Sequence, residues 1–266
     1  MRSRPLTRLA LNTVAAAALV AAIGCGDSTA PNASAITNRG FPVNFNELRA
    51  ALEKARAEQN GGLNLNMWAT IVDRDGRVVA VAFTGDGRGD QWPGSRVISA
   101  QKANTANSFS LDALALSTAN LFSAAQPGGS LFGLQESNPV DTRVAYGGDP
   151  RDYGTPHDFM VGKRIGGVNV FGGGLALYDA KGDIIGAVGV SGDTSCADHN
   201  IAWKVRDFLA LDYVPGGVSA TGDDNIIYDI TSGVSAGGFG HTDCGNGEKP
   251  IGVALPTSNP ISHPMS

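Results

Sequence analysis

The sequence predicts an α+β fold in which antiparallel hairpins form a sheet covered by helices. The first observation is a pair of similar segments, 72–86 and 178–193, each with an acidic turn ending in Gly, a run of small and β-branched residues, and Gly-Asp. The second is that a helix signal follows each hairpin. Hairpins pair in antiparallel fashion, and the helices can then cover the resulting sheet. The likeness of the hairpins is no proof of common ancestry, because glycine-turned hairpins resemble one another.

Helix signals occur at four places along the chain. Asn44 is a capping residue with Glu47 three positions later, and apolar residues then recur at helical spacing until Asn-Gly-Gly at 60–62. The other three predicted helices have less complete signals: 95–109, which has a face of small residues; a short helix capped at 117–118; and one from 193 or 194 to 211.

Strand signals are β-branched runs bounded by turn residues, and they occur in four ranges: 67–73, 78–84, 175–179 and 184–190. A further strand is expected near 226–230. The segment from 126 to 174 is rich in Gly, Pro and Asp, and a loop of this length is often functional. The rest of the C-terminal segment has few regular signals. We expect it to run over the surface of the domain and to form no second core.

Composition excludes some classes of protein. The chain has 266 residues, 42% of them hydrophobic, and a formal net charge of -5. No basic stripe is present, so we expect no nucleic-acid partner. The 36 glycines follow no G-x-y period, which excludes collagen. The sequence contains no G-x-S-x-G, H-E-x-x-H, P-loop or Rossmann motif, so it leaves open whether the protein is an enzyme.

The N-terminus predicts export and lipidation. Three arginines precede an apolar segment that ends in Ala-Ile-Gly-Cys, which is typical of a bacterial lipoprotein signal. We therefore expect a signal peptide at 1–24, lipidation of Cys25 and a flexible tether at 25–42. The protein would then be a periplasmic or cell-envelope lipoprotein that meets the membrane through its lipid anchor only. The alternative is an ordinary secretory signal with a chance cysteine.

The other two cysteines, Cys196 and Cys244, predict a disulfide, because thiols of an exported protein are usually oxidised. The alternative is a metal site. His199 follows Cys196 by three positions and His241 precedes Cys244 by three, so a Cys2His2 cluster is conceivable, although this spacing fits no standard zinc motif.

Several of these segments together resemble a known family. They are Lys102-Ala103 with Thr105-Ala106 and Phe109, Ser117-Thr118 with Leu121, Gly172-Gly173, the run Gly-Ala-Val-Gly-Val-Ser-Gly at 186–192, and Asp198. This pattern resembles the GlcG/HbpS-like family of haem-binding or haem-degrading domains, also found fused to PduO-type cobalamin enzymes. The resemblance gives a domain at 43–212 with an insertion at about 126–171 and an irregular C-terminal extension at 213–266.

The resemblance implies a profilin-like or PAS-like fold with a five-stranded antiparallel sheet, a homo-oligomeric assembly, and haem or another small planar molecule as ligand. The motif positions that it implies for ligand binding are Lys102, Thr105, Phe109, Thr118, Gly189 and Ser191. The chain departs from the family pattern where Ser117 replaces a proline and where Gly174-Leu175 replace the proline of G-G-x-P. The glycine run at 186–192 has two explanations, which are compatible: it lets a helix cross a strand closely, and it leaves room for a flat ligand.

A haem iron usually needs an axial ligand such as His, Cys, Met or Tyr. His157, in the insertion beside Met160, and His199, after the second hairpin, are the candidates. Each of them alone is more typical of a surface or capping histidine than of an iron ligand.

The sequence therefore predicts an exported module that binds haem or a related tetrapyrrole in haem handling or redox sensing. One alternative is an enzyme or sensor that acts on a small organic acid, with the insertion as a lid. Another is a structural oligomer without a ligand.

Overall fold

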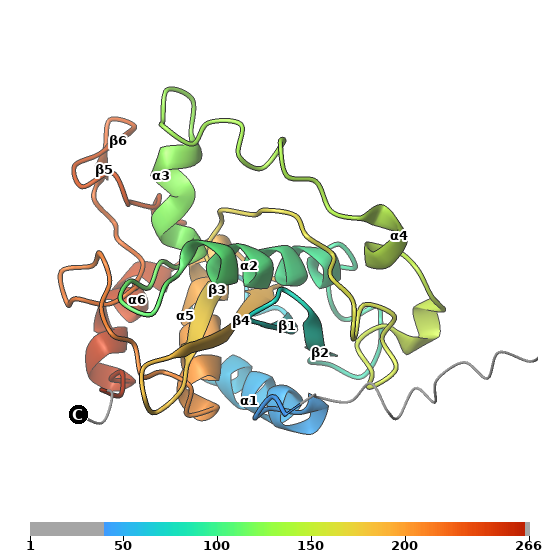
Figure 1. The fold of residues 1–266 in the computed structure, drawn as a ribbon. Helices are drawn as coiled ribbons and strands as arrows, with labels where there is room; N and C mark the ends of the chain where they lie inside the picture. Colours follow the sequence, from blue (N-terminus) through green and yellow to red (C-terminus); the bar gives the residue numbers. More distant parts are fainter. Residues whose placement is uncertain (1–39, 264–266) are drawn as a thin grey trace, which may run out of the picture. The chain divides into compact units, whose positions relative to one another are not determined.

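The computed structural model describes residues 40–263. The predicted signal peptide, Cys25 and most of the predicted tether lie outside this range. Within it, one antiparallel sheet has the strand order β2-β1-β4-β3 (Figure 1). Its strands are β1 (Trp68–Asp73), β2 (Val78–Phe83), β3 (Gly174–Tyr178) and β4 (Ile184–Ser191). Across residues 40–263, no helix is both long and apolar enough to cross a bilayer.

The two similar hairpins meet edge to edge, which confirms the α+β prediction. Strand β1 of the first hairpin pairs with β4 of the second in a continuous antiparallel register that runs from Trp68 opposite Ser191 to Asp73 opposite Gly186. The outer strands, β2 and β3, then complete the sheet on either side. Segments about a hundred residues apart in the chain thus share one hydrogen-bonded surface.

The structure does not confirm a fifth strand. At the β3 edge of the sheet, Tyr178 N–H donates to the Leu211 carbonyl, and Tyr178 and Asp212 form a single parallel bridge. Pro215 follows shortly afterwards, and its ring nitrogen has no hydrogen to donate to a ladder. The chain therefore touches the open edge at one point and leaves it, so the sheet of the described residues has four strands.

Helices cover both faces of the sheet because side chains alternate along each strand. Helix α2 (Ser95–Phe109) lies on one face and packs against Trp68 and Val72. Helices α1 (Phe45–Ala57) and α5 (Ser195–Phe208) cover the other face and pack against Ala69 and Ile71. Asn44 forms the predicted capping box at the start of α1.

Gly189, in the glycine run at 186–192, lets α2 pack closely on the sheet. A Cβ atom on Gly189 would overlap the Ser99 carbonyl oxygen and would lie 2.5 Å from the Ala103 nitrogen. The space above Gly189 is therefore filled by the helix backbone and holds no flat ligand, contrary to the second of the two explanations. The predicted small residues Ala100, Ala103 and Ala106 are all fully buried on α2.

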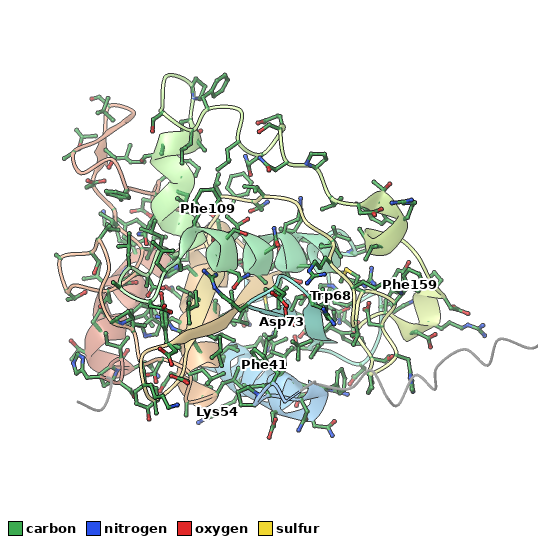
Figure 2. All side chains as sticks on the ribbon, in the orientation of Figure 1. Phe41, Lys54, Trp68, Asp73, Phe109 and Phe159 are labelled. Atoms are coloured by element: carbon green, nitrogen blue, oxygen red, sulfur yellow. A yellow bond between two sulfur atoms is a disulfide. The ribbon has the colours of Figure 1, made fainter. Side chains whose placement is uncertain are left out.

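The insertion runs over the outer side of α2 (Figure 1). After a 3-10 turn (Thr118–Leu121) and α3 (Phe122–Ala125), it contains only α4 (Thr142–Ala145) and a second 3-10 turn (Pro150–Asp152). A buried ion pair fixes it to the helix, with Arg96 Nε 2.8 Å from Asp158 Oδ2. Figure 2 shows Phe109 on the part of α2 nearest α3 and Phe159 far from it, in the region of the second 3-10 turn.

The C-terminal extension packs on α5, where the sequence predicted only surface wrapping. It contains the short pair β5 (Ile230–Thr231) and β6 (Val234–Ser235), and helix α6 (Glu248–Ser258). Only Ile230 of the strand expected at 226–230 is in a strand. The sequence did not predict α6 because Pro256 lies inside it, and a proline inside a helix normally removes a hydrogen bond.

We expect Gly189→Ala to lower the free energy of unfolding by at least 1–3 kcal/mol, the usual range for overpacking a core, since α2 or β4 must move to admit the methyl group. Gly89→Ala is the matched control. That glycine is exposed, has no positive φ and has no atom within 4 Å of the added Cβ. Urea unfolding of both variants measures the difference. Equal unfolding midpoints for the two variants would show that the α2 backbone does not pack against Gly189 closely enough to exclude a methyl group.

Candidate functional site

A cavity of about 300 Å³ lies where the end of β4 meets α2 and the start of α5. We call it the α2–α5 cavity. Three larger cavities lie elsewhere: one of about 350 Å³ beside the turn of the first hairpin, one of about 380 Å³ beside the end of α1, and one of about 370 Å³ between α1 and the end of α5. The α2–α5 cavity is the stronger candidate because it joins motif residues from both halves of the domain.

The polar floor of the cavity is built on a buried ion pair. Lys102 of α2 places its Nζ 2.6 Å from Asp198 Oδ2 of α5, and the same Nζ donates to the Val190 carbonyl at 3.1 Å. Both side chains are at most 3% exposed. The other Asp198 oxygen accepts the Asp193 N–H at 2.9 Å, so the carboxylate is satisfied on both sides.

Burial raises the pKa of the Asp198 carboxyl to about 6, and the charge and hydrogen bond of Lys102 oppose that rise. The carboxyl is therefore ionised at neutral pH, and the ion pair with Lys102 is intact there. Three serines, Ser95, Ser191 and Ser195, and the carboxylate of Asp193 complete the polar part of the wall.

The apolar part of the wall comes from Trp92, Ile98 and Phe171. Trp92 precedes α2 and is 50% exposed, whereas Phe171 ends the insertion and is 43% exposed. Large aromatic side chains usually bury their rings, so two half-exposed ones at one opening indicate a surface for an apolar ligand. Sequence reasoning missed both residues. The signal that could have indicated them is an aromatic residue beside each of two glycine-containing turns, at Gly94 and at Gly172-Gly173.

Only two of the six motif positions expected to bind ligand line this cavity, Lys102 and Ser191. Thr118 stands behind the wall and holds Phe171 in place, because its hydroxyl donates to the Phe171 carbonyl at 2.5 Å. It also accepts the Gly174 N–H at 2.9 Å.

The other three motif positions have structural roles. The Thr105 hydroxyl accepts the Asn169 N–H at 2.9 Å and so positions the last part of the insertion. Phe109 packs against the apolar cluster around Leu121. Gly189 lies beneath α2, as described above.

The predicted disulfide is present, and it joins Cys196 in the first turn of α5 to Cys244 in the extension, with a Cα–Cα distance of 6.1 Å. His241 lies beside it, and the three donor atoms are within 4.8 Å of one another. His199 is not part of this group. The structure therefore shows the disulfide and does not assemble the four-residue metal cluster.

The two histidines proposed as haem ligands lie outside the cavity wall. His157 is exposed on the insertion. His199 is fully buried under the extension, where its Nε2 accepts the Ile226 N–H at 3.1 Å. Burial lowers the pKa of His199 to about 3, which keeps its imidazole neutral.

Lys102→Met and Asp198→Asn should each lower the free energy of unfolding by about 3–5 kcal/mol, because each leaves one buried charge without its partner. The double variant should be no less stable than either single variant, since it removes both charges. Urea unfolding of the four proteins gives the coupling energy.

The exposed pair Arg49–Glu53 is the control for this cycle. Its side chains are 48% and 50% exposed at a separation of 2.8 Å, so Arg49→Met and Glu53→Gln should show a coupling of only about 0.3–0.5 kcal/mol. Equal coupling energies for the two pairs would contradict a desolvated Lys102–Asp198 pair.

Comparison with known proteins places the domain in a family. Similar solved structures include protein ORFY of Klebsiella pneumoniae, which is 27% identical and covers 65% of this chain and 97% of its own, with a TM-score of 0.42. Others are the PduOC:haem complex (25% identity, 62% of this chain and 94% of that one, TM-score 0.42) and a doubly substituted HbpS of Streptomyces reticuli (18%, 72% and 97%, TM-score 0.37). Among curated proteins, none has a sequence that matches this chain.

The family described as haem-degrading, HbpS-like proteins matches residues 44–206. This range contains the whole sheet, helices α1, α2 and nearly all of α5, and every residue of the cavity wall. The chain therefore belongs to the HbpS-like family of haem-degrading proteins.

Proposed function

We propose that this protein is an exported lipoprotein that binds haem or a related tetrapyrrole at the α2–α5 cavity, in haem handling or redox sensing. Membership of the HbpS-like family supports the class of ligand. The observation that carries the location is the pair of half-exposed aromatic side chains, Trp92 and Phe171, at the opening of a cavity with a charged floor.

The residues of the wall fit the ring of a tetrapyrrole. Trp92, Ile98 and Phe171 would contact its apolar faces, and the hydroxyl groups of Ser191 and Ser195 would lie at its polar edge. A volume of about 300 Å³ is at the lower end of the range for ligand sites, about 300–1,000 Å³, so the cavity would hold one edge of the macrocycle and leave the rest at the surface.

The wall offers no iron ligand. Its residues include no His, Cys, Met or Tyr, which are the side chains that usually ligate haem iron. When bound, haem would supply a redox-active iron. In this protein the chain's own contribution is contact with the ring and partial exclusion of water by the two aromatic side chains.

Titration of the purified domain with hemin should give a shifted Soret band. Trp92→Ala and Phe171→Ala should each weaken binding about 2- to 10-fold, because an aromatic contact is worth about 0.5–1.5 kcal/mol. Phe132→Ala is the matched control, since Phe132 is 65% exposed and lies outside the cavity wall.

A flat hemin titration would remove the proposal. Stabilisation by small organic acids in a thermal-shift screen would then favour the sensor or enzyme alternative. A stable assembly in light scattering, with no response to either class of ligand, would favour a structural oligomer.

Anchoring by lipid is a separate part of the proposal and rests on the sequence around Cys25. Expression of the full chain in bacteria fed an alkyne-labelled fatty acid should label the wild-type protein and leave Cys25→Ala unlabelled. The disulfide cysteines serve as an internal control, because neither is available for acylation. Equal labelling of the two proteins, or none in the wild type, would refute the lipid anchor.

A further inference from the structure

We propose that Ser195 and His241 form a nucleophile–base pair that hydrolyses carboxylic esters bound in the α2–α5 cavity. This activity goes beyond haem binding and does not depend on it. Ser195 lines the cavity at the first residue of α5, and its Oγ is 3.2 Å from His241 Nε2. In enzymes with an activated serine, the serine lies on the wall of a cavity and its hydroxyl is within hydrogen-bond reach of an imidazole. Ser195 and His241 have this arrangement.

The hydrogen bonds of His241 assign its tautomer. Its Nδ1 is 2.7 Å from the Thr242 carbonyl oxygen, which can only accept, so Nδ1 carries the hydrogen and donates. The lone pair of Nε2 is then free to accept the Ser195 hydroxyl hydrogen. The Thr242 carbonyl orients the ring in the way that a carboxylate does in a Ser-His-Asp triad.

The surroundings keep His241 neutral. The side chain is 1% exposed, and the Phe122 ring lies 4.5 Å from the imidazole, centroid to centroid. Burial lowers the pKa of His241 to about 4. The imidazole is therefore uncharged at neutral pH and can take a proton from the serine, and its low pKa makes it a weaker base than a free imidazole.

The start of α5 supplies donors for a developing oxyanion. The N–H groups of Ser195 and Cys196 belong to the first helical turn, which has no intrahelical acceptors, and they donate to no acceptor among residues 40–263. In hydrolases that place a serine at a strand-to-helix turn, the N–H of the next residue helps to bind the oxyanion. Here β4 ends at Ser191 and α5 begins at Ser195, so the nucleophile has the same place between strand and helix.

The disulfide holds the base against the nucleophile. Cys196 is the neighbour of Ser195, and Cys244 follows His241 by three residues, so the bond between the cysteines ties the His241 loop to the first turn of α5. Cys244 Sγ is itself 3.6 Å from Ser195 Oγ. The domain thus contributes Ser195, and the extension contributes His241.

The reaction needs only an ester and water. Ser195 Oγ attacks the ester carbonyl carbon while His241 Nε2 takes the hydroxyl proton, and the N–H groups of Ser195 and Cys196 stabilise the oxyanion. The C–O bond to the alcohol then breaks, and His241 returns the proton to the leaving oxygen. Water, deprotonated by His241, hydrolyses the acyl-serine and restores both side chains. The apolar wall of Trp92, Ile98 and Phe171 favours short acyl or aryl esters.

A fluorophosphonate probe and p-nitrophenyl butyrate test the proposal on the haem-free protein. The probe should label the wild type, and mass spectrometry should place the adduct on Ser195. Ser195→Ala should abolish labelling and reduce hydrolysis to the buffer rate. His241→Gln should slow hydrolysis about 10²- to 10⁴-fold, the usual contribution of a general base. Ser108→Ala, at an exposed serine of α2, should behave like the wild type.

Several results would overturn the proposal. They are no adduct on a wild-type protein that shows a cooperative thermal transition, an adduct at another serine, or hydrolysis that Ser195→Ala leaves unchanged. The wild-type adduct does not depend on whether His241→Gln folds. Since no hemin is present, failure here and failure of the hemin titration are separate outcomes.

Discussion

The ion pair between Lys102 and Asp198 is the interaction on which the arrangement of this site depends. It connects α2 on one face of the sheet to α5 on the other, and it passes the end of β4, where the ammonium also bonds the Val190 carbonyl. Because desolvating two charges costs several kcal/mol per ion, the pair is a poor source of net stability. Its effect is on geometry: it fixes where the first turn of α5 stands relative to α2, and so it sets the width of the cavity between them.

The same device attaches the two segments that fall outside the sheet. Arg96 of α2 holds Asp158 of the insertion, and Arg206 of α5 holds Asp224 of the extension with two contacts of 2.8 Å. In each case the helix supplies the cation and the added segment supplies the carboxylate, and all four side chains are at most 2% exposed. The ion pair with Asp158 thereby adds to the apolar contacts of the insertion, such as those of Met160 and Ile165 with the cluster around α2.

The sequence predicted the regular parts of the domain well, because local signals dictate them. Turn glycines and β-branched runs located the strands to within one or two residues, and the small-residue face located α2. The predicted fifth strand does not form, and a single bridge at Tyr178 stands in its place. Whether a strand forms at this edge depends on the path of the chain after α5, which local signals do not dictate. Of the site, the sequence indicated Lys102, Ser191 and Asp198, which lie in motifs. It could not indicate Trp92, Phe171 or the contact between Ser195 and His241, because these depend on how distant loops pack. Gly189 could not be interpreted from the sequence, because a missing side chain makes room equally for a closely packed helix and for a ligand.

Most of helix α5 is shielded from solvent, and eleven of its residues are buried. Its polar residues His199, Asn200 and Arg206 are each fully buried and hydrogen-bonded to residues of the extension. Without the extension, all three side chains would lose these hydrogen bonds and would face solvent. Grafting this tail onto a domain that lacks it would therefore require these three residues on α5 as well.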